Sequence, residues 1–186
     1  MASETERIRA EVNIRDALPL HIPSDPDWQP DAPGGEVGGL DIGGLVERPR
    51  ILSTAELATL PRARRSEPFV CEEGWAIERL TWEGIPLREA LTCCAPLPEA
   101  RFVRVYAGDY WLALPLDEVD RALLCDRLDD QPLSREHGAP WRLVLSGGAC
   151  FTSVKWVSRL ELAADAGTPT AERIARGRIA APGAGD

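Results

Sequence analysis

The sequence predicts an α+β fold in which a mixed β-sheet is combined with short helices. Segments with strand and helix patterns are interspersed along the chain, and several strand pairs are joined by hairpin-like turns. This arrangement fits an α+β domain better than a doubly wound parallel fold, and the chain contains no G-x-G-x-x-G fingerprint and no Walker A sequence. With 186 residues, 44% of them hydrophobic and 27% charged, the chain is long enough for one well-filled globular core.

Several segments have the apolar and polar alternation that is typical of strands. They are 40–46 (with a glycine break), 69–71, 76–82, 101–106, 110–114, 141–145 and 153–162. A capping-box pattern, Ser53 with Glu56, predicts a short helix over 53–60. Prolines near the start of 86–94 and of 115–124 predict two further helices.

This patterning divides the chain into three regions. Residues 1–37 are an irregular N-terminal arm, 38–163 are the patterned domain, and 164–186 are a loose C-terminal tail rich in alanine and glycine. The arm is interrupted by prolines at positions 19, 23, 26, 30 and 33.

Charge and composition exclude several classes of function. A net charge of −9 argues against a surface for nucleic acid or anionic membranes, because both need basic patches. No apolar stretch reaches the roughly 18–20 residues of a membrane span, and the start lacks a signal-peptide core. We therefore expect a soluble cytoplasmic protein of undetermined oligomeric state. The five cysteines show no C-x-x-C or zinc-site spacing, so we expect thiols.

Cys71 is the first candidate for chemistry. It ends an apolar run and is followed by two glutamates and Gly74-Trp75, so it lies at a turn and not in the middle of a strand. A thiolate at such a place suits a soft metal, which deprotonates the thiol outright. Buried packing is the alternative. A nucleophilic role lacks a neighbouring base, and Glu72 and Glu73 would raise the thiol pKa.

Two further segments together suggest a phosphate site. His137 and Arg142 flank a Gly-Ala-Pro-Trp turn, and arginine offers a planar fork that matches phosphate oxygens. Lys155, the single lysine beside twenty arginines, follows Ser153 and Val154 after a glycine-containing loop. A surface turn and a strand with an exposed lysine are the alternatives. The combination favours a cluster that binds an anion.

The chain resembles the molybdopterin-binding domain of the sulfite oxidase superfamily, including protein-methionine-sulfoxide reductase catalytic subunits. The resemblance runs from about Leu40 to Leu162. It is carried by four motifs in the family's order: Gly44-Leu45-Val46-Glu47-Arg48-Pro49; Cys71-Glu72-Glu73-Gly74-Trp75 with Trp82-Glu83-Gly84-Ile85-Pro86-Leu87; Pro132-Leu133 before His137-Gly138-Ala139-Pro140-Trp141-Arg142-Leu143-Val144; and Ser153-Val154-Lys155-Trp156.

The resemblance implies a mixed α+β fold that holds molybdenum-molybdopterin. Cys71 would be the protein's thiolate ligand to molybdenum. The pterin phosphate would be held by His137, Arg142 and Lys155, with Ser153 and Val154 adding hydrogen bonds largely through the backbone. The implied reaction is two-electron oxygen-atom transfer on a small oxo-substrate that is sulfite- or sulfoxide-like, with an unidentified electron-transfer partner.

The sequence departs from the family pattern at several positions. Ser146, Cys150 and Thr152 stand where the family often has proline, glycine and a basic residue. Tyr110, near the tip of a predicted hairpin, is the strongest candidate donor to an oxo-substrate, and a packed tyrosine is the alternative. Two other functions therefore remain: a pterin-binding carrier or interaction module with little activity, and a structural protein that has lost the cofactor.

Overall fold

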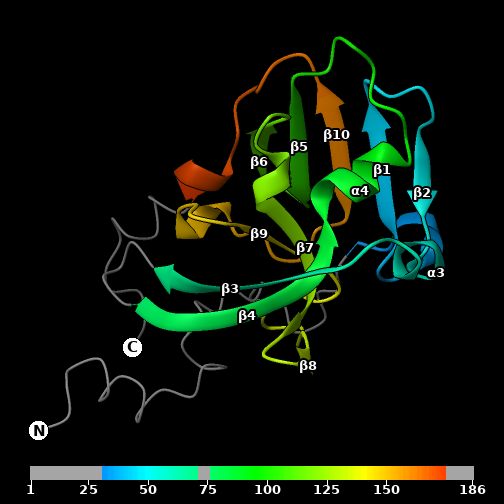
Figure 1. Ribbon diagram of the computed structural model, residues 1–186. Helices are drawn as coiled ribbons and strands as arrows, with labels where there is room; N and C mark the ends of the chain where they lie inside the picture. Colours follow the sequence, from blue (N-terminus) through cyan, green and yellow to red (C-terminus); the bar gives the residue numbers. More distant parts are fainter. Residues whose placement is uncertain (1–30, 71–75, 175–186) are drawn as a thin grey trace, which may run out of the picture.

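The computed structural model describes residues 31–70 and 76–174, which form two β-sheets and a few short helices (Figure 1). The strands are β1 (Leu40–Gly44), β2 (Arg50–Leu52), β3 (Ala63–Val70), β4 (Ala76–Pro86), β5 (Phe102–Ala107), β6 (Tyr110–Pro115), β7 (Ala122–Leu128), β8 (Gln131–Pro132), β9 (Arg142–Leu145) and β10 (Arg159–Ala163). The helices are η1 (Pro33–Gly35), α3 (Thr54–Ala58), α4 (Leu87–Thr92), η2 (Val119–Arg121) and η3 (Cys150–Thr152). None of these helices has the length and apolar character that crossing a membrane requires.

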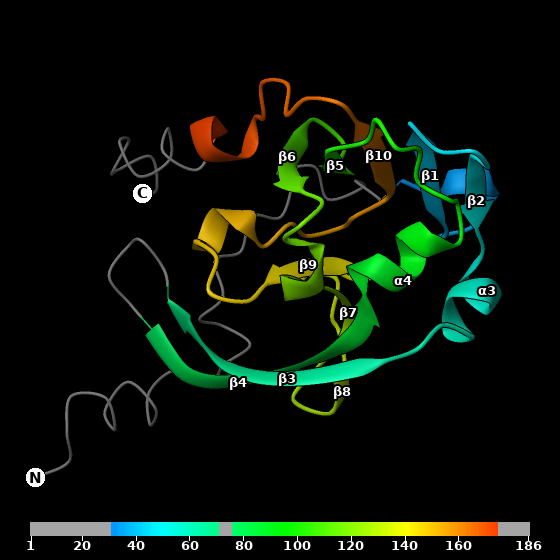
Figure 2. The same ribbon diagram turned by 45° about the horizontal axis from the view of Figure 1, so that its top comes forward.

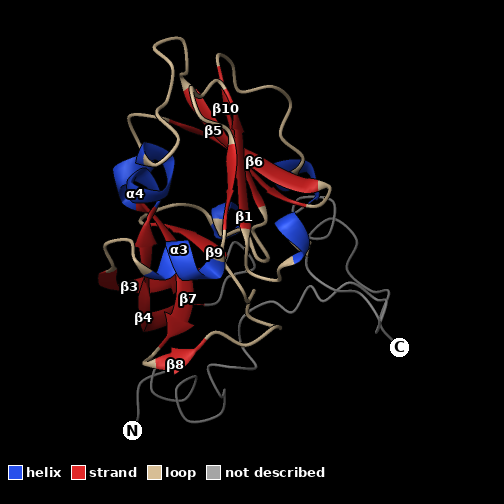
Figure 3. Cartoon of the chain, turned by 90° about the vertical axis from the view of Figure 1, so that its right-hand side faces the viewer, coloured by secondary structure: helices blue, strands red, loops and turns tan. Residues whose placement is uncertain are grey.

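The first sheet is mixed, as the sequence predicts. Its strand order is β2-β1-β10-β5-β6, in which β1 and β10 are parallel and the other neighbours antiparallel. The second sheet has the order β3-β4-β7-β8, with β9 also paired to β7, and all its pairs are antiparallel. Figure 3 shows the first sheet above the second, with α3 and α4 at one side. The α+β prediction is confirmed.

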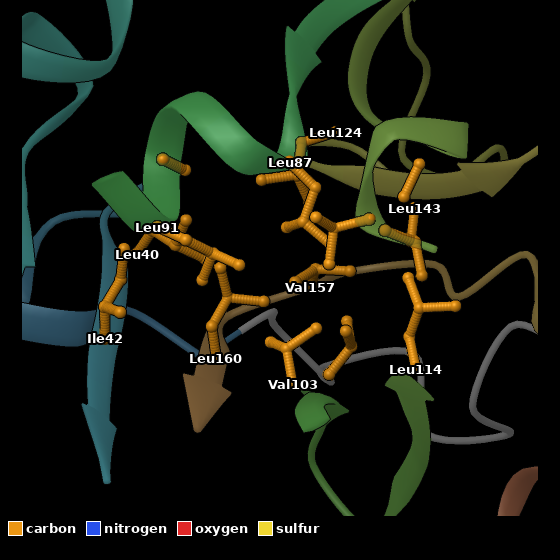
Figure 4. Packing of buried hydrophobic residues seen from close by; sticks show 14 of the residues in the cluster. Leu40, Ile42, Leu87, Leu91, Val103, Leu114, Leu124, Leu143, Val157 and Leu160 are labelled. Carbon is orange, nitrogen blue, oxygen red and sulfur yellow. The ribbon is translucent and has the colours of Figure 1, made fainter. Parts of the chain in front are cut away.

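The main core lies between the two sheets. Side chains from the first sheet, from α4 and from β7 and β9 meet there, as Figure 4 shows for Leu40, Leu87, Val103, Leu124 and Leu143. Burial of such residues is the main favourable term in folding, at about 25 cal/mol per Å² of apolar surface.

A second, smaller core lies on the other face of the second sheet. It contains Phe69, Leu80, Trp82, Leu123, Cys125, Leu128, Leu133 and Val144. Because β7 has apolar neighbours on both faces, residues 122–125 are buried without interruption. The helix predicted over 115–124 is therefore wrong except for the three-residue turn η2: Pro115 ends β6, residues 116–118 form a turn, and residues 122–124 belong to β7. A continuous apolar run is typical of a strand covered on both sides, and periodicity alone does not distinguish it from a helix.

The strand predicted over 153–162 is also wrong in its first half. Only 159–163 form β10, because Trp156 has a left-handed φ of 58° that interrupts an extended strand. The residues before β10 instead bond beside β9, where Leu143 donates to the Val154 carbonyl and Val157 to the Trp141 carbonyl. Other local predictions are confirmed, among them the Ser53–Glu56 capping box and the 101–114 hairpin.

The described part of the region predicted as a tail contacts the first sheet. Thr170 donates through its backbone to the Trp111 carbonyl and accepts from the Trp111 amide, and Ala171 is buried. The boundary at residue 163 stays a prediction.

The longest strand pair is the β3–β4 hairpin, whose free end flanks residues 71–75 (Figures 1 and 2). Where β4 passes onto β7, Gly84 allows a close approach of the two backbones. A Cβ atom at Gly84 would lie 1.9 Å from the Leu124 carbonyl oxygen and 2.6 Å from the Cys125 Cα atom. This contact explains the glycine in the Trp82–Leu87 motif.

We expect Gly84→Ala to lower the free energy of unfolding by about 3 kcal/mol or more, because a rigid backbone must move to admit the methyl group. Gly43→Ala is the matched control, since a Cβ atom there meets nothing within 4 Å. Urea unfolding of both variants measures the difference. Equal stabilities would contradict the close packing at Gly84.

Candidate functional site

Arg142, at the start of β9, is at the centre of the predicted anion site. Its Nε donates to Ser153 Oγ at 3.1 Å, and its Nη1 donates to the His137 carbonyl at 3.1 Å. The Ser153 hydroxyl in turn donates to the Leu143 carbonyl at 3.2 Å. Three residues predicted to act together are therefore joined directly by hydrogen bonds.

The Arg142 guanidinium is a buried cation. The residue is 2% exposed, and within residues 31–70 and 76–174 no carboxylate forms an ion pair with it. Burial lowers the pKa of Arg142 to about 10, although Cys125, Tyr110 and Cys150 each act to raise it. Burial also raises the pKa of Cys125, so that thiol stays protonated and does not neutralise the cation. A buried, uncompensated cation is costly unless an anion binds beside it.

Two aromatic rings cover the guanidinium. Its Cζ lies 5.0 Å from the Trp82 ring centroid and 5.7 Å from the Phe69 ring centroid. Both rings come from the β3–β4 hairpin, and Phe69 precedes Cys71 by two residues. Such cation–π contacts contribute about 0.5–2 kcal/mol each, the higher value applying to desolvated cations. The hairpin that leads to the predicted metal ligand therefore contacts the cation of the predicted phosphate site.

Lys155 is held against the turn that contains His137. Its Nζ donates to the Glu136 carbonyl at 2.7 Å. Gly138, with φ of +108°, allows the turn to approach, because a Cβ atom there would lie 2.9 Å from Lys155 Cβ. Trp156 adds two bonds, from its backbone to the Gly138 carbonyl and from its indole to the Arg135 carbonyl.

The remaining predicted residues complete the cluster. His137 is buried, and its Nδ1 shares a hydrogen bond of 2.8 Å with Ser134 Oγ. Val154 is fully buried, and its carbonyl accepts from the Leu143 amide at 2.8 Å. We refer to His137, Arg142, Ser153, Val154 and Lys155 as the clamp. The structure brings all five together from two separate segments of the chain.

Tyr110, at the start of β6, also lies at this site. Its hydroxyl donates to the Phe151 carbonyl at 2.6 Å, two residues before Ser153. The η3 segment lies between β6 and the free ends of β3 and β4 in both Figure 1 and Figure 2. Cys150, which begins η3, packs against the second core.

The predicted ligand Cys71 lies outside the described residues. Its role therefore stays a prediction. Within the described ranges, no group of three or more histidine, cysteine, aspartate or glutamate side chains is placed to hold a metal ion.

Sequence reasoning misses several residues that shape the clamp. Gly138 is part of the predicted turn, but its close approach to Lys155 joins segments that are 17 positions apart. Phe69 and Trp82 have the pattern of ordinary strand residues, and only the fold places them over Arg142. The two aromatic positions carry no local signal for this role.

The donors of the clamp suit a phosphate monoester. Arginine supplies a planar fork, lysine a compact charge, and serine and histidine can contribute polar atoms. The buried cation supplies the charge complementarity that such a ligand needs.

Comparison with known proteins identifies the family. The model of the oxidoreductase molybdopterin binding domain matches residues 38–170. The chain is 25% identical over 163 residues to the uncharacterized oxidoreductase YuiH of Bacillus subtilis, which covers 86% of this chain and 81% of YuiH. It is 32% identical over 133 residues to the protein-methionine-sulfoxide reductase catalytic subunit MsrP of Xanthomonas axonopodis pv. citri, covering 61% of this chain and 41% of MsrP.

Longer relatives share the same domain. Mitochondrial sulfite oxidase of Homo sapiens is 29% identical over 170 residues, which covers 76% of this chain and 31% of that protein. The crystal structure of the sulfane dehydrogenase SoxCD from Paracoccus pantotrophus matches with a TM-score of 0.66 and 25% identity, over 71% of this chain and 39% of that chain. The chain thus spans less than half of MsrP, of sulfite oxidase and of the matched SoxCD chain.

These matches confirm the predicted fold, the molybdopterin cofactor and the oxidoreductase class at the level of the family. The chain belongs to the oxidoreductase molybdopterin-binding domain family, whose members include sulfite oxidase and MsrP.

Proposed function

We propose that the chain binds molybdenum-molybdopterin, with Cys71 as the protein ligand to molybdenum, and catalyses two-electron oxygen-atom transfer on a sulfite- or sulfoxide-like substrate. The clamp would hold the pterin phosphate. Tyr110 would lie at the same site.

One observation carries the proposal. The Arg142 cation, 2% exposed and without a carboxylate among the described residues, is bonded to His137 and Ser153 and covered by Phe69 and Trp82. It therefore links the clamp with the hairpin that leads to Cys71. An anionic cofactor that extends from the clamp to the hairpin end would compensate the buried charge.

The cofactor would supply the redox chemistry, and the chain would supply position and electrostatics. Oxidation of sulfite to sulfate takes an oxygen atom from water and releases two electrons and two protons. Reduction of a sulfoxide consumes two electrons and two protons and releases water. Either direction requires a separate electron partner, because the two electrons released or consumed in each turnover must leave or enter the site.

The residues of the clamp would each have a defined part in binding. Arg142 would offer its fork from a dry environment, in which a charge-assisted hydrogen bond is stronger than in water. Lys155 would add a point charge whose position is fixed by its bond to Glu136. His137, held by Ser134, would keep its ring in one orientation beside the phosphate.

A second function is suggested by the loop before Ser153. Thr152 stands where the family often has a basic residue, so the clamp contains fewer charges. A pterin carrier or interaction module with little activity of its own would need the clamp but not a substrate pocket. Turnover with sulfite or a sulfoxide, measured per bound molybdenum, separates the two functions. A cytoplasmic location stays a prediction from the sequence.

Replacement of the proposed ligand tests the metal site. We expect Cys71→Ser, expressed in a host that makes the cofactor, to lose molybdenum and to lower turnover about 100-fold or more, with unchanged circular dichroism. Cys93→Ser is the matched control, because Cys93 is half-buried at the end of α4 and donates to the Glu89 carbonyl. Full molybdenum content and turnover in Cys71→Ser would exclude the ligand role.

Inorganic phosphate tests the clamp in the cofactor-free chain. At about ten times its dissociation constant, phosphate should raise the melting temperature by roughly 3–6 °C above a chloride control of equal ionic strength. We expect Arg142→Gln to lose this increase and Arg64→Gln, a change of an exposed arginine paired with Asp130, to keep it. The same increase in Arg142→Gln would place phosphate elsewhere.

The Gly138 contact gives a third test. Gly138→Ala should lower the free energy of unfolding by about 1–3 kcal/mol and weaken phosphate binding, because the methyl group displaces Lys155. Gly108→Ala is the control, since Gly108 also has a positive φ (59°) but meets nothing within 4 Å. If both variants bind phosphate like the unaltered chain, the close approach of Gly138 to Lys155 does not determine how the clamp binds phosphate.

A further inference from the structure

We propose that Tyr110 is a positioning residue that fixes the η3 segment, and through it Ser153 and Lys155, and that it does not donate a proton to the substrate. The inference rests on the proposed function for the meaning of the clamp. It deepens that function because it assigns to Tyr110 a role in binding the cofactor.

The Tyr110 hydroxyl is already engaged by the protein backbone. Its Oη donates to the Phe151 carbonyl at 2.6 Å, a bond between residues 41 positions apart. A phenol has one proton to donate. With that proton on a backbone carbonyl, the hydroxyl cannot at the same time donate to an oxo-substrate.

The Tyr110 ring projects from a fixed element. Tyr110 pairs with Ala107 at the end of the β5–β6 hairpin, and β5 pairs in turn with β10. The next residue, Trp111, exchanges hydrogen bonds with Thr170 and stacks on Tyr106 with ring centroids 5.3 Å apart. The phenol ring is therefore attached to a part of the first sheet that is hydrogen-bonded to β5 on one side and to Thr170 on the other.

The η3 segment, by contrast, contributes no fully buried residue, although Phe151 packs against the main core and Cys150 against the second core. It is a single turn of three residues, none of them buried, and it comes after Gly147 and Gly148. Its local bonds are those from Thr152 to the Ala149 carbonyl and from the Ser153 amide to the Cys150 carbonyl. So short a turn needs a contact from outside to keep one position.

Two residues of the clamp lie just beyond η3 in the chain. Ser153 comes directly after it and accepts the hydrogen bond from Arg142 Nε, and Lys155 comes two residues later. Tyr110 also lies close enough to Arg142 to raise the pKa of the guanidinium against the effect of burial. A shift of η3 would therefore change the position of Ser153 Oγ and the donors that Arg142 presents.

The experiment uses the full chain and Tyr110→Phe, which removes the hydroxyl and keeps the ring. Tyr106→Phe is the matched control, because Tyr106 is the other tyrosine of the chain and lies in the same hairpin. We measure hydrogen exchange of residues 149–155, affinity for inorganic phosphate, molybdenum content, and turnover per bound molybdenum.

We expect Tyr110→Phe to increase exchange of residues 149–155 by about 3- to 10-fold, the effect of one lost hydrogen bond. Phosphate affinity should fall by a similar factor, and molybdenum content should fall with it. Turnover per bound molybdenum should stay within about twofold of the unaltered chain, since the reacting groups are untouched. Tyr106→Phe should change none of these quantities.

Two results would overturn the inference. Unchanged exchange and molybdenum content with a large loss of turnover per molybdenum would make Tyr110 a donor to the substrate. Unchanged exchange and phosphate affinity with unchanged turnover would give it no role at the clamp. Absence of molybdenum from the unaltered chain would count against the proposed function, whereas exchange and phosphate affinity would still decide the role of Tyr110.

Discussion

The arrangement of the site depends on one buried cation. Arg142 has lost almost all contact with water. Among the described residues its partners are one hydroxyl, one carbonyl and two aromatic rings, and none of them is a carboxylate. Hydrogen bonds and cation–π contacts recover part of the hydration that was lost, but they do not neutralise the charge. For stability alone, an apolar residue at this position would serve at least as well as a buried arginine. Among the described residues the charge has no ionic partner, which agrees with the proposed phosphate ligand as the other half of an ion pair.

The two-sheet fold explains how this cation is kept dry. Along β9 the side chains alternate, so that Leu143 enters the main core while Arg142 and Val144 face the second core. β7, buried on both faces, separates the two cores, and Gly84 lets β4 pass close to it. The second core thus does more than stabilise the β3–β4 hairpin. Its rings, Phe69 and Trp82, form the wall that excludes water from Arg142.

The sequence predicts much of this and misses what depends on tertiary packing. The fold class, the 101–114 hairpin, the strand predicted over 76–82 and the capping box at Ser53 all rest on local patterns, and the structure contains them. The strand predicted over 69–71 is found only in part, because β3 begins at Ala63 and Cys71 lies outside the described residues. The errors have tertiary causes. Residues 122–125 are apolar because they pack into both cores. Residues 153–158 do not form a regular strand because Trp156 has a left-handed φ of 58°, and the hydrogen bonds of this segment go to Leu143 and Trp141. The grouping of His137, Arg142 and Lys155 was predictable from residue type, but their contacts with Gly138 and Phe69 were not.

The segments that form the clamp differ in how firmly the rest of the protein holds them. The β5–β6 hairpin and β9 are held by backbone ladders and by packing, whereas η3 is a single, partly buried turn that comes after two glycines. The residues with charge or hydroxyl groups, Ser153 and Lys155, come from the less constrained segment. Each of these two side chains donates a hydrogen bond to a more firmly held segment, Ser153 to the Leu143 carbonyl and Lys155 to the Glu136 carbonyl. Since a charged ligand is bound well only by donors that are already in place, these ties matter more for binding than for stability. The bond from Tyr110 to Phe151 belongs to the same set, because it fixes the segment that leads to Ser153 and Lys155.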